Sequence, residues 1–215
     1  MRIRKNRSKE APAVHYLIRG SLDKMSLYEL PRYTEEGRYM LKLIGGLAAV
    51  AVIVILILAA MKPSTFIVER SVTINTAPEK IAPLINDFHN WNDWSPWAKL
   101  DPTMKTSYSG APAGVGSVYE WEGNSKVGKG RMEIRSVEPA KTSIKLDFLK
   151  PFENHNIADF VLQPEGANAT RVTWVMYGPL TFIPGKVMSV FTSMDSIIGD
   201  EFQRGLANLK AAAEK

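Results

Sequence analysis

One uninterrupted apolar run divides the chain. Residues 43–61 contain no charged or strongly polar side chain over 19 positions, and Lys42 and Lys62 flank them. As a helix this run would extend about 28 Å, close to the ~30 Å hydrocarbon core of a bilayer. A signal peptide usually has an apolar region of only ~7–15 residues after a short leader. The pattern therefore predicts one uncleaved transmembrane helix.

Beyond the apolar run, the pattern predicts one α+β domain over residues 63–215. Residues 65–76 alternate between apolar and polar positions and are rich in β-branched side chains, which predicts a strand. Residues 77–88 predict a helix with Thr76 as its N-cap. Residues 91–102 predict a short helical turn, which prolines interrupt.

Six further strands are predicted between residues 104 and 179, separated by turns rich in glycine and proline. In five of these strands one set of alternate positions is apolar, and the other set is mostly polar. This alternation is typical of an antiparallel sheet that is covered on one face. The apolar set comprises Tyr119, Trp121, Met132, Ile134, Ile144, Leu146, Phe148, Ala158, Phe160, Leu162, Val172, Trp174 and Met176.

One long helix over residues 184–213 is predicted to cover the dry face of the sheet. Its apolar positions recur at spacings of three and four: Val187, Phe191, Met194, Ile198, Phe202, Leu206 and Leu209. At ~1.5 Å per residue it would be over 40 Å long. The predicted fold is thus a curved antiparallel sheet of about seven strands that grips a long C-terminal helix, preceded by one transmembrane helix.

Charge is distributed unequally across the apolar run. Residues 1–42 carry ten basic and five acidic side chains, whereas residues 62–215 carry 17 of each. Because the domain has no excess positive charge to hold phosphates, we do not expect it to bind nucleic acid. The positive-inside tendency predicts a cytoplasmic tail in an inner or plasma membrane, with the domain on the extracytoplasmic side.

The basic tail, residues 1–42, has two interpretations that the sequence leaves open. Its basic side chains could bind anionic headgroups, at about 1 kcal/mol each, or the tail could have no specific role, which we favour. Translation from Met40 would remove it. The chain contains no cysteine, so disulfides and thiolate metal sites are excluded. The pattern does not distinguish a monomer from an oligomer.

Segments that cover most of residues 66–210 carry a resemblance to a known superfamily. They are ERSVTINTAPEKI, NDFHNWNDWSPWAKLDP, YSGAPAGVGSVYEWEG, GKGRMEI and GDEFQRGLANLK. In these segments the chain resembles the helix-grip (SRPBCC, START-like) superfamily, which includes START lipid-transfer domains, pollen allergens and the polyketide cyclase/dehydrase group. The resemblance implies a hydrophobic cavity between sheet and long helix that takes a lipid-like or other apolar molecule. It carries over no catalytic residue.

Aromatic and aliphatic side chains on the dry surfaces are the candidate ligand-binding residues. Tryptophan buries a large apolar area, and methionine adapts to ligands of different shape. Ordinary core packing explains the same positions, and we favour it for Trp91 and Trp94. The candidates are Tyr119, Trp121, Met132, Ile134, Phe148, Phe160, Trp174, Met176, Phe191, Met194, Ile198 and Phe202.

No catalytic residue, metal site or cofactor is predicted. His89 lies near Asp87 and Asp93, but packing of an aromatic-rich loop explains that group better than metal binding. No nucleophile elbow or nucleotide-binding loop is present. Strand parity places Asp159 and Tyr177 away from the dry face.

Three functions remain for the chain. The main hypothesis is membrane-anchored binding or transfer of a lipophilic small molecule, with the lipid bilayer contacted through residues 43–61. One alternative is a cyclase- or dehydratase-like enzyme that acts on a polyketide or related apolar substrate. The other is an interaction module that needs no ligand.

Overall fold

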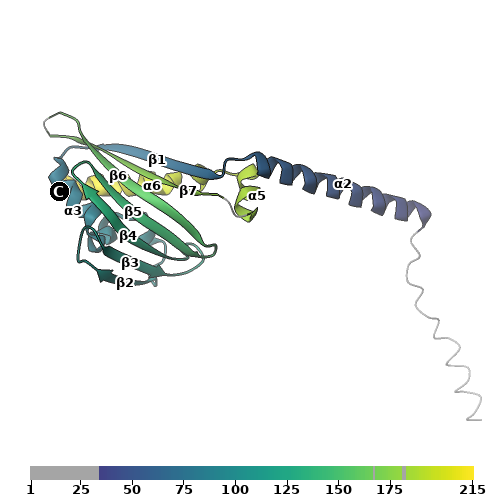
Figure 1. Ribbon diagram of the computed structural model, residues 1–215, viewed down its shortest axis with the longest axis horizontal. Coiled ribbons are helices and arrows are strands. Elements are labelled where there is room, and N and C mark those ends of the chain that lie inside the picture. Colours follow the sequence, from purple (N-terminus) through teal and green to yellow (C-terminus); the bar gives the residue numbers. More distant parts are fainter. Residues whose placement is uncertain (1–33, 167, 181–182) are drawn as a thin grey trace, which may run out of the picture. The chain divides into compact units, whose positions relative to one another are not determined.

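The computed structural model describes residues 34–166, 168–180 and 183–215 (Figure 1). The chain separates into two compact units, Met1–Ala51 and Val52–Lys215, and each is considered by itself. The interpretations of the basic tail before residue 34 lie outside the described residues.

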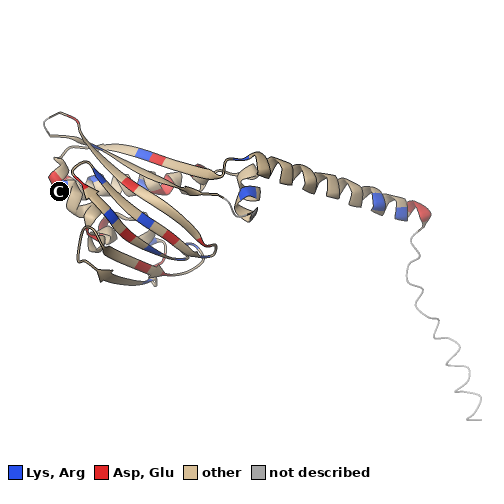
Figure 2. Cartoon of the chain, viewed as in Figure 1, with Lys and Arg blue, Asp and Glu red and all other residues tan. Residues whose placement is uncertain are grey.

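Helix α2 (Glu35–Met61) contains the predicted apolar run and begins eight residues before it. Thr34 and the two glutamates explain this earlier start. The Thr34 side chain accepts a hydrogen bond from the Gly37 N–H at 3.3 Å, and Glu35 and Glu36 lie in the first turn, where carboxylates interact favourably with the helix dipole. The charged positions of α2 are confined to its N-terminal end (Figure 2). The helix is long and apolar enough to cross a membrane.

The domain is built on a single sheet whose seven strands confirm the predicted ones. All neighbours are antiparallel in the order β1-β7-β6-β5-β4-β3-β2, so β1 and β2 form its edges. The strands are β1 (Thr65–Ile74), β2 (Lys105–Gly110), β3 (Ser117–Glu122), β4 (Lys129–Glu138), β5 (Lys141–Lys150), β6 (Asn154–Pro164) and β7 (Thr170–Pro179).

Four short helices connect β1 to β2: α3 (Pro78–Asn86), η1 (Phe88–Asn90), α4 (Trp91–Trp94) and η2 (Pro96–Lys99). The prediction that Thr76 caps α3 is wrong, because Ala77 occupies the N-cap position. The Thr76 carbonyl instead accepts a hydrogen bond from the Thr170 hydroxyl at 2.7 Å. This hydrogen bond joins Thr76, just after the end of β1, to β7.

The predicted single C-terminal helix is wrong in one respect, because it is divided into α5 (Ile183–Phe191) and α6 (Met194–Ala213). Ser193 caps α6 by accepting from the Ser196 N–H at 3.0 Å, and the Ser196 hydroxyl accepts from the Ser193 N–H at 3.1 Å. This reciprocal cap satisfies two backbone donors at a new helix start. Of these two helices, α6, about 30 Å long for its 20 residues, packs along the sheet.

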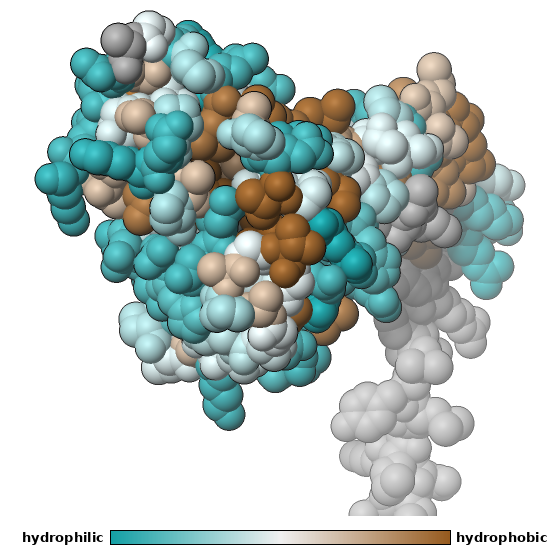
Figure 3. Space-filling model, turned by 60° about the vertical axis from the view of Figure 1, so that its left-hand side comes forward, coloured by the Kyte–Doolittle hydropathy of each residue, from teal (hydrophilic) through white to brown (hydrophobic). Residues whose placement is uncertain are grey.

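The two faces of the sheet differ as the alternation predicted, and the α+β helix-grip fold is confirmed. The inner face and α6 enclose the core, in which Phe202, Leu206 and Leu209 are fully buried. The outer face carries ion pairs such as Lys141–Asp159, at 2.8 Å, and acidic and basic positions recur along its strands (Figure 2). The face of the domain in Figure 3 is largely hydrophilic, with a few hydrophobic residues grouped together.

Candidate ligand-binding site

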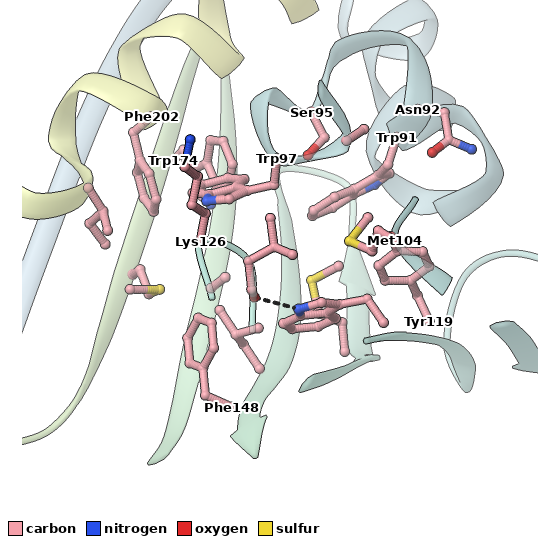
Figure 4. Close-up of a pocket in the computed structure, with 18 of the residues that line it drawn as sticks. Trp91, Asn92, Ser95, Trp97, Met104, Tyr119, Lys126, Phe148, Trp174 and Phe202 are labelled. Carbon is pink, nitrogen blue, oxygen red and sulfur yellow. Dashed lines mark hydrogen bonds between the residues drawn. The ribbon is translucent and has the colours of Figure 1, made fainter. Parts of the chain in front are cut away.

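A cavity of about 230 Å³ lies between the inner face of the sheet, α6 and the α4–η2 segment (Figure 4). Nine of the twelve candidate residues line it. They are Tyr119, Trp121, Met132, Phe148, Trp174, Met176, Met194, Ile198 and Phe202.

The other three candidates do not reach the cavity. Ile134 and Phe160 are fully buried in the core beside it. Phe191 is 72% exposed, because α5 ends at Phe191 and α6 begins only at Met194. Helical periodicity continues across this break, so the pattern alone predicted an inward side chain.

Ten lining residues were absent from the candidate set. The α4–η2 segment contributes five of them, including Trp91, for which the sequence favours ordinary core packing. Leu146 and Ala158 share the inward parity of the candidates and could have been included. The full set is Trp91, Asn92, Ser95, Trp97, Ala98, Met104, Lys126, Val127, Leu146 and Ala158.

The indole of Trp121 packs against the β3–β4 hairpin. Its Nε1–H donates a 3.0 Å hydrogen bond to the carbonyl of Val127 (dashed in Figure 4). Gly130 on β4 makes room for the ring, since a Cβ there would overlap it. Trp91 is fixed similarly, by a 2.9 Å hydrogen bond to the Ile85 carbonyl. Because both N–H groups are satisfied by the backbone, these two indoles offer the cavity apolar surface.

Trp174 is the centre of an aromatic cluster that forms one wall. Its ring stacks on Phe202, with centroids 4.1 Å apart, and on Phe160, at 4.9 Å. Trp97 meets it edge-on at 5.6 Å. Such ring pairs each contribute about 0.5–1.5 kcal/mol beyond their buried area. The Trp174 Nε1 is buried and has no hydrogen-bond partner among the described residues.

The cavity contains few polar groups. Lys126 is the one charged side chain among its described lining residues (Figure 4). Burial, together with the nearby Tyr108, raises the pKa of the Tyr119 hydroxyl to about 12. Tyr119 therefore keeps its proton at neutral pH. The site can accept an apolar body and attract an acidic group at Lys126.

The polar residues that parity placed outside the cavity do lie outside it. The Tyr177 hydroxyl donates to the Asp159 carboxylate at 3.3 Å on the outer face. Within the described part of the chain, no cluster of three or more histidine or acidic side chains could hold a metal ion.

Together, the fold and the cavity define a helix-grip domain with an apolar cavity between the sheet and α6. The chain belongs to the family described as "Polyketide cyclase / dehydrase and lipid transport", whose sequence model matches residues 65–214. A comparison with curated proteins finds no match.

Solved structures of distant relatives share this fold. The KanY protein is 14% identical, with a TM-score of 0.52, and the match covers 71% of this chain and 100% of KanY. A hypothetical protein from Helicobacter pylori, jhp0584, is 11% identical, with a TM-score of 0.52 over 69% of this chain and 88% of its own. The Zhui aromatase/cyclase from Streptomyces sp. R1128 is 13% identical, with a TM-score of 0.49, 70% of this chain and 94% of Zhui being covered. At these identities the likeness concerns the fold alone.

Proposed function

We propose that this chain binds or transfers a lipophilic small molecule while its apolar helix anchors it in a membrane. The observation that carries the proposal is the cavity, whose described lining includes one charged side chain, Lys126, among 19 residues. Its volume of about 230 Å³ exceeds the ~150 Å³ of an engineered apolar cavity that stays dry and binds benzene. An apolar space of this size favours an apolar occupant over water.

The family description supports this proposal and also leaves an enzymatic alternative. It names lipid transport beside polyketide cyclases and dehydrases. Tyr119 and Ser95, whose side chains carry hydroxyls, are among the lining residues, which favours a cyclase- or dehydratase-like reaction as the second candidate. General acid–base chemistry works best with a group whose pKa lies near the working pH. Tyr119, with a pKa of about 12, does not meet that condition, so binding without chemistry remains the better hypothesis.

The membrane enters the proposal through residues 43–61 of α2. The excess of basic residues before this run favours a cytoplasmic N-terminus and an extracytoplasmic domain. Only residues 62–64 separate the end of α2 from β1. Such a short link would hold the domain near the bilayer, which is a source of lipophilic molecules.

The test is mass spectrometry of the molecules that copurify with the full chain in mild detergent. Lipids bound around an apolar helix would also be detected, so the control must keep that helix. The variant Ala158→Trp is this control, because Ala158 lies on β6, is 2% exposed and lines the cavity. An indole there would fill the space while leaving α2 unchanged.

We expect at least one lipophilic compound to be present in the wild-type extract and depleted in that of Ala158→Trp. Identical extracts, with no binding of added apolar probes to the wild type, would refute the proposal. If Ala158→Trp folds, binds nothing and keeps its biological role, the domain is instead an interaction module. If the wild-type protein converts the copurified compound into a product on incubation, the enzymatic alternative is correct.

A further inference from the structure

Helix α5 presents large apolar side chains on its surface. Phe191 is 72% exposed, although helical periodicity directed it toward the sheet, and Met188 is 49% exposed. Ile197, on the first turns of α6, is 47% exposed. Scattered apolar side chains are normal on a protein surface, whereas a group of large ones on one short stretch marks an interaction site.

The strand register places a second apolar segment at the same end of the sheet. β1 begins at Thr65, opposite Pro179, where β7 ends and leads toward α5. The β5–β6 turn follows Phe148, which lies opposite Asn154 at the beginning of β6. Because antiparallel neighbours reverse direction, this turn lies at the end of the sheet that holds the start of β1. Phe152 in the turn is 51% exposed.

Hydrogen bonds connect α5 to the residues that directly follow α2. The Leu180 N–H donates to the Ser64 carbonyl at 2.7 Å, and the Lys186 Nζ donates to the Ser64 hydroxyl at 3.1 Å. Ser64 comes three residues after Met61, the last residue of α2. An extended chain of three residues spans at most about 11 Å. If the apolar run crosses a bilayer, Ser64 and the Lys186 side chain bonded to it lie near the lipid headgroups.

Two lysines lie within or close to α5. Lys186 lies within α5, and Lys62 is exposed just before the start of β1. Aromatic and aliphatic side chains flanked by lysines are typical of helices that lie in a membrane interface. Each basic residue near an anionic surface contributes about 1 kcal/mol.

We propose that α5 and the β5–β6 turn form a docking surface for an anionic bilayer, with Phe191, Met188 and Phe152 entering the interface. Met194 and Lys126, which line the cavity, belong to the start of α6 and to the β3–β4 turn beside this surface. Docking would therefore bring the cavity next to the lipid from which a ligand is taken. The inference rests on the membrane anchor of the proposed function and adds a second, independent contact with the bilayer.

The absence of cysteine from the whole chain makes a direct test available. Single-cysteine variants of the full chain, each carrying a fluorophore sensitive to polarity, are reconstituted into vesicles of phosphatidylcholine and phosphatidylglycerol. Phe191→Cys probes the docking surface. Val115→Cys is the matched control, because Val115 is apolar, 59% exposed and located in the β2–β3 turn at the opposite end of the sheet. Ile53→Cys, within the apolar run, reports on the anchor.

Quenching by lipids that carry a nitroxide then gives the depth of each label. We expect strong quenching at position 53, clear quenching with a blue-shifted emission at 191, and neither effect at 115. Replacing phosphatidylglycerol with phosphatidylcholine should weaken the signal at 191 several-fold and leave that at 53 unchanged.

Two results would overturn the docking surface. One is quenching at 53 with a fully hydrated label at 191. The other is a label at 191 that is shielded from water but not quenched, since protein, such as a second copy of the chain, would then cover it. Failure of quenching at 53 would instead refute the anchor, and with it the proposed function.

Discussion

Two glycines in α6 provide a matched test of how tightly this helix packs against the cavity wall. Gly199 and Gly205 are both buried within the helix. In a helix interior, replacing glycine with alanine normally stabilises by about 1 kcal/mol. We predict that the same substitution has opposite effects at these two positions, because the surroundings of the added methyl group differ.

At Gly205 the added Cβ would meet two rigid groups. It would lie 2.8 Å from Cζ3 of Trp174 and 3.1 Å from Cδ of Pro96, and neither buried ring can move without disturbing the aromatic wall. Overpacking of this kind costs about 1–3 kcal/mol. After the helix-propensity gain, Gly205→Ala should destabilise the domain by about 0–2 kcal/mol.

At Gly199 the added Cβ would overlap the guanidinium group of Arg70. This group is the free end of a flexible side chain, which pairs with Asp195 at 2.6 Å at the surface. It can move aside, and exposed ion pairs contribute little to stability. Gly199→Ala should therefore keep most of the ~1 kcal/mol helix gain.

The assay is unfolding of the full chain in detergent by tryptophan fluorescence, which reports on the domain because all five tryptophans lie within it. The two variants should differ by the overpacking cost of about 1–3 kcal/mol, or about 2–12 °C in Tm. Trp174→Phe removes Cζ3 of the indole, the atom nearest to the added Cβ. In that background Gly205→Ala should therefore destabilise the domain less. Equal stabilisation by both alanines, or no coupling to Trp174, would refute the close packing of α6 on this wall.

Two further predictions concern charged groups. Burial would raise the pKa of the Asp147 carboxyl, but contacts with Lys145 at 2.8 Å and His155 at 2.7 Å outweigh it and hold the pKa below its ordinary value. The unfolded state then binds more protons, so this stabilisation is complete above pH ~4 and lost on acidification through the folded-state pKa. Asp147→Asn should lessen the loss of stability below pH ~4, and an unchanged acid-unfolding profile would contradict this. Lys126→Gln should weaken binding of an acidic amphiphile several-fold but not that of its neutral analogue, whereas Lys99→Gln, an exposed lysine outside the cavity, should change neither. Equal losses for both ligands would show that Lys126 does not recognise charge.

The break between α5 and α6 shows where sequence periodicity ceases to be informative. Phe191 and Met194 are three residues apart, which fits a continuous helical stripe, yet only Met194 lines the cavity. Ser193 and Ser196 form the capping box that starts a new helix. The pair was visible in the sequence, but a helix pattern on both sides of it favoured continuity.

The lining of the cavity shows a second limit. Phe148 and Phe160 share the inward parity, but Phe148 faces the cavity and Phe160 is fully buried. Phe160 packs against Trp94, with ring centroids 5.9 Å apart, and stacks on Trp174. Whether an inward side chain meets another side chain or empty space depends on contacts between segments that are distant in the sequence.

The sequence by itself determined the strands, their dry face, the apolar helix and the residues available to line a cavity. These features follow from local periodicity and from the length of an apolar run, which neighbouring residues specify. Only the tertiary structure decided that α6 begins at Met194, that the α4–η2 segment closes the cavity, and that Phe191 lies on the surface. These outcomes depend on how separate segments pack around Trp174 and Trp121, and no local pattern records that packing.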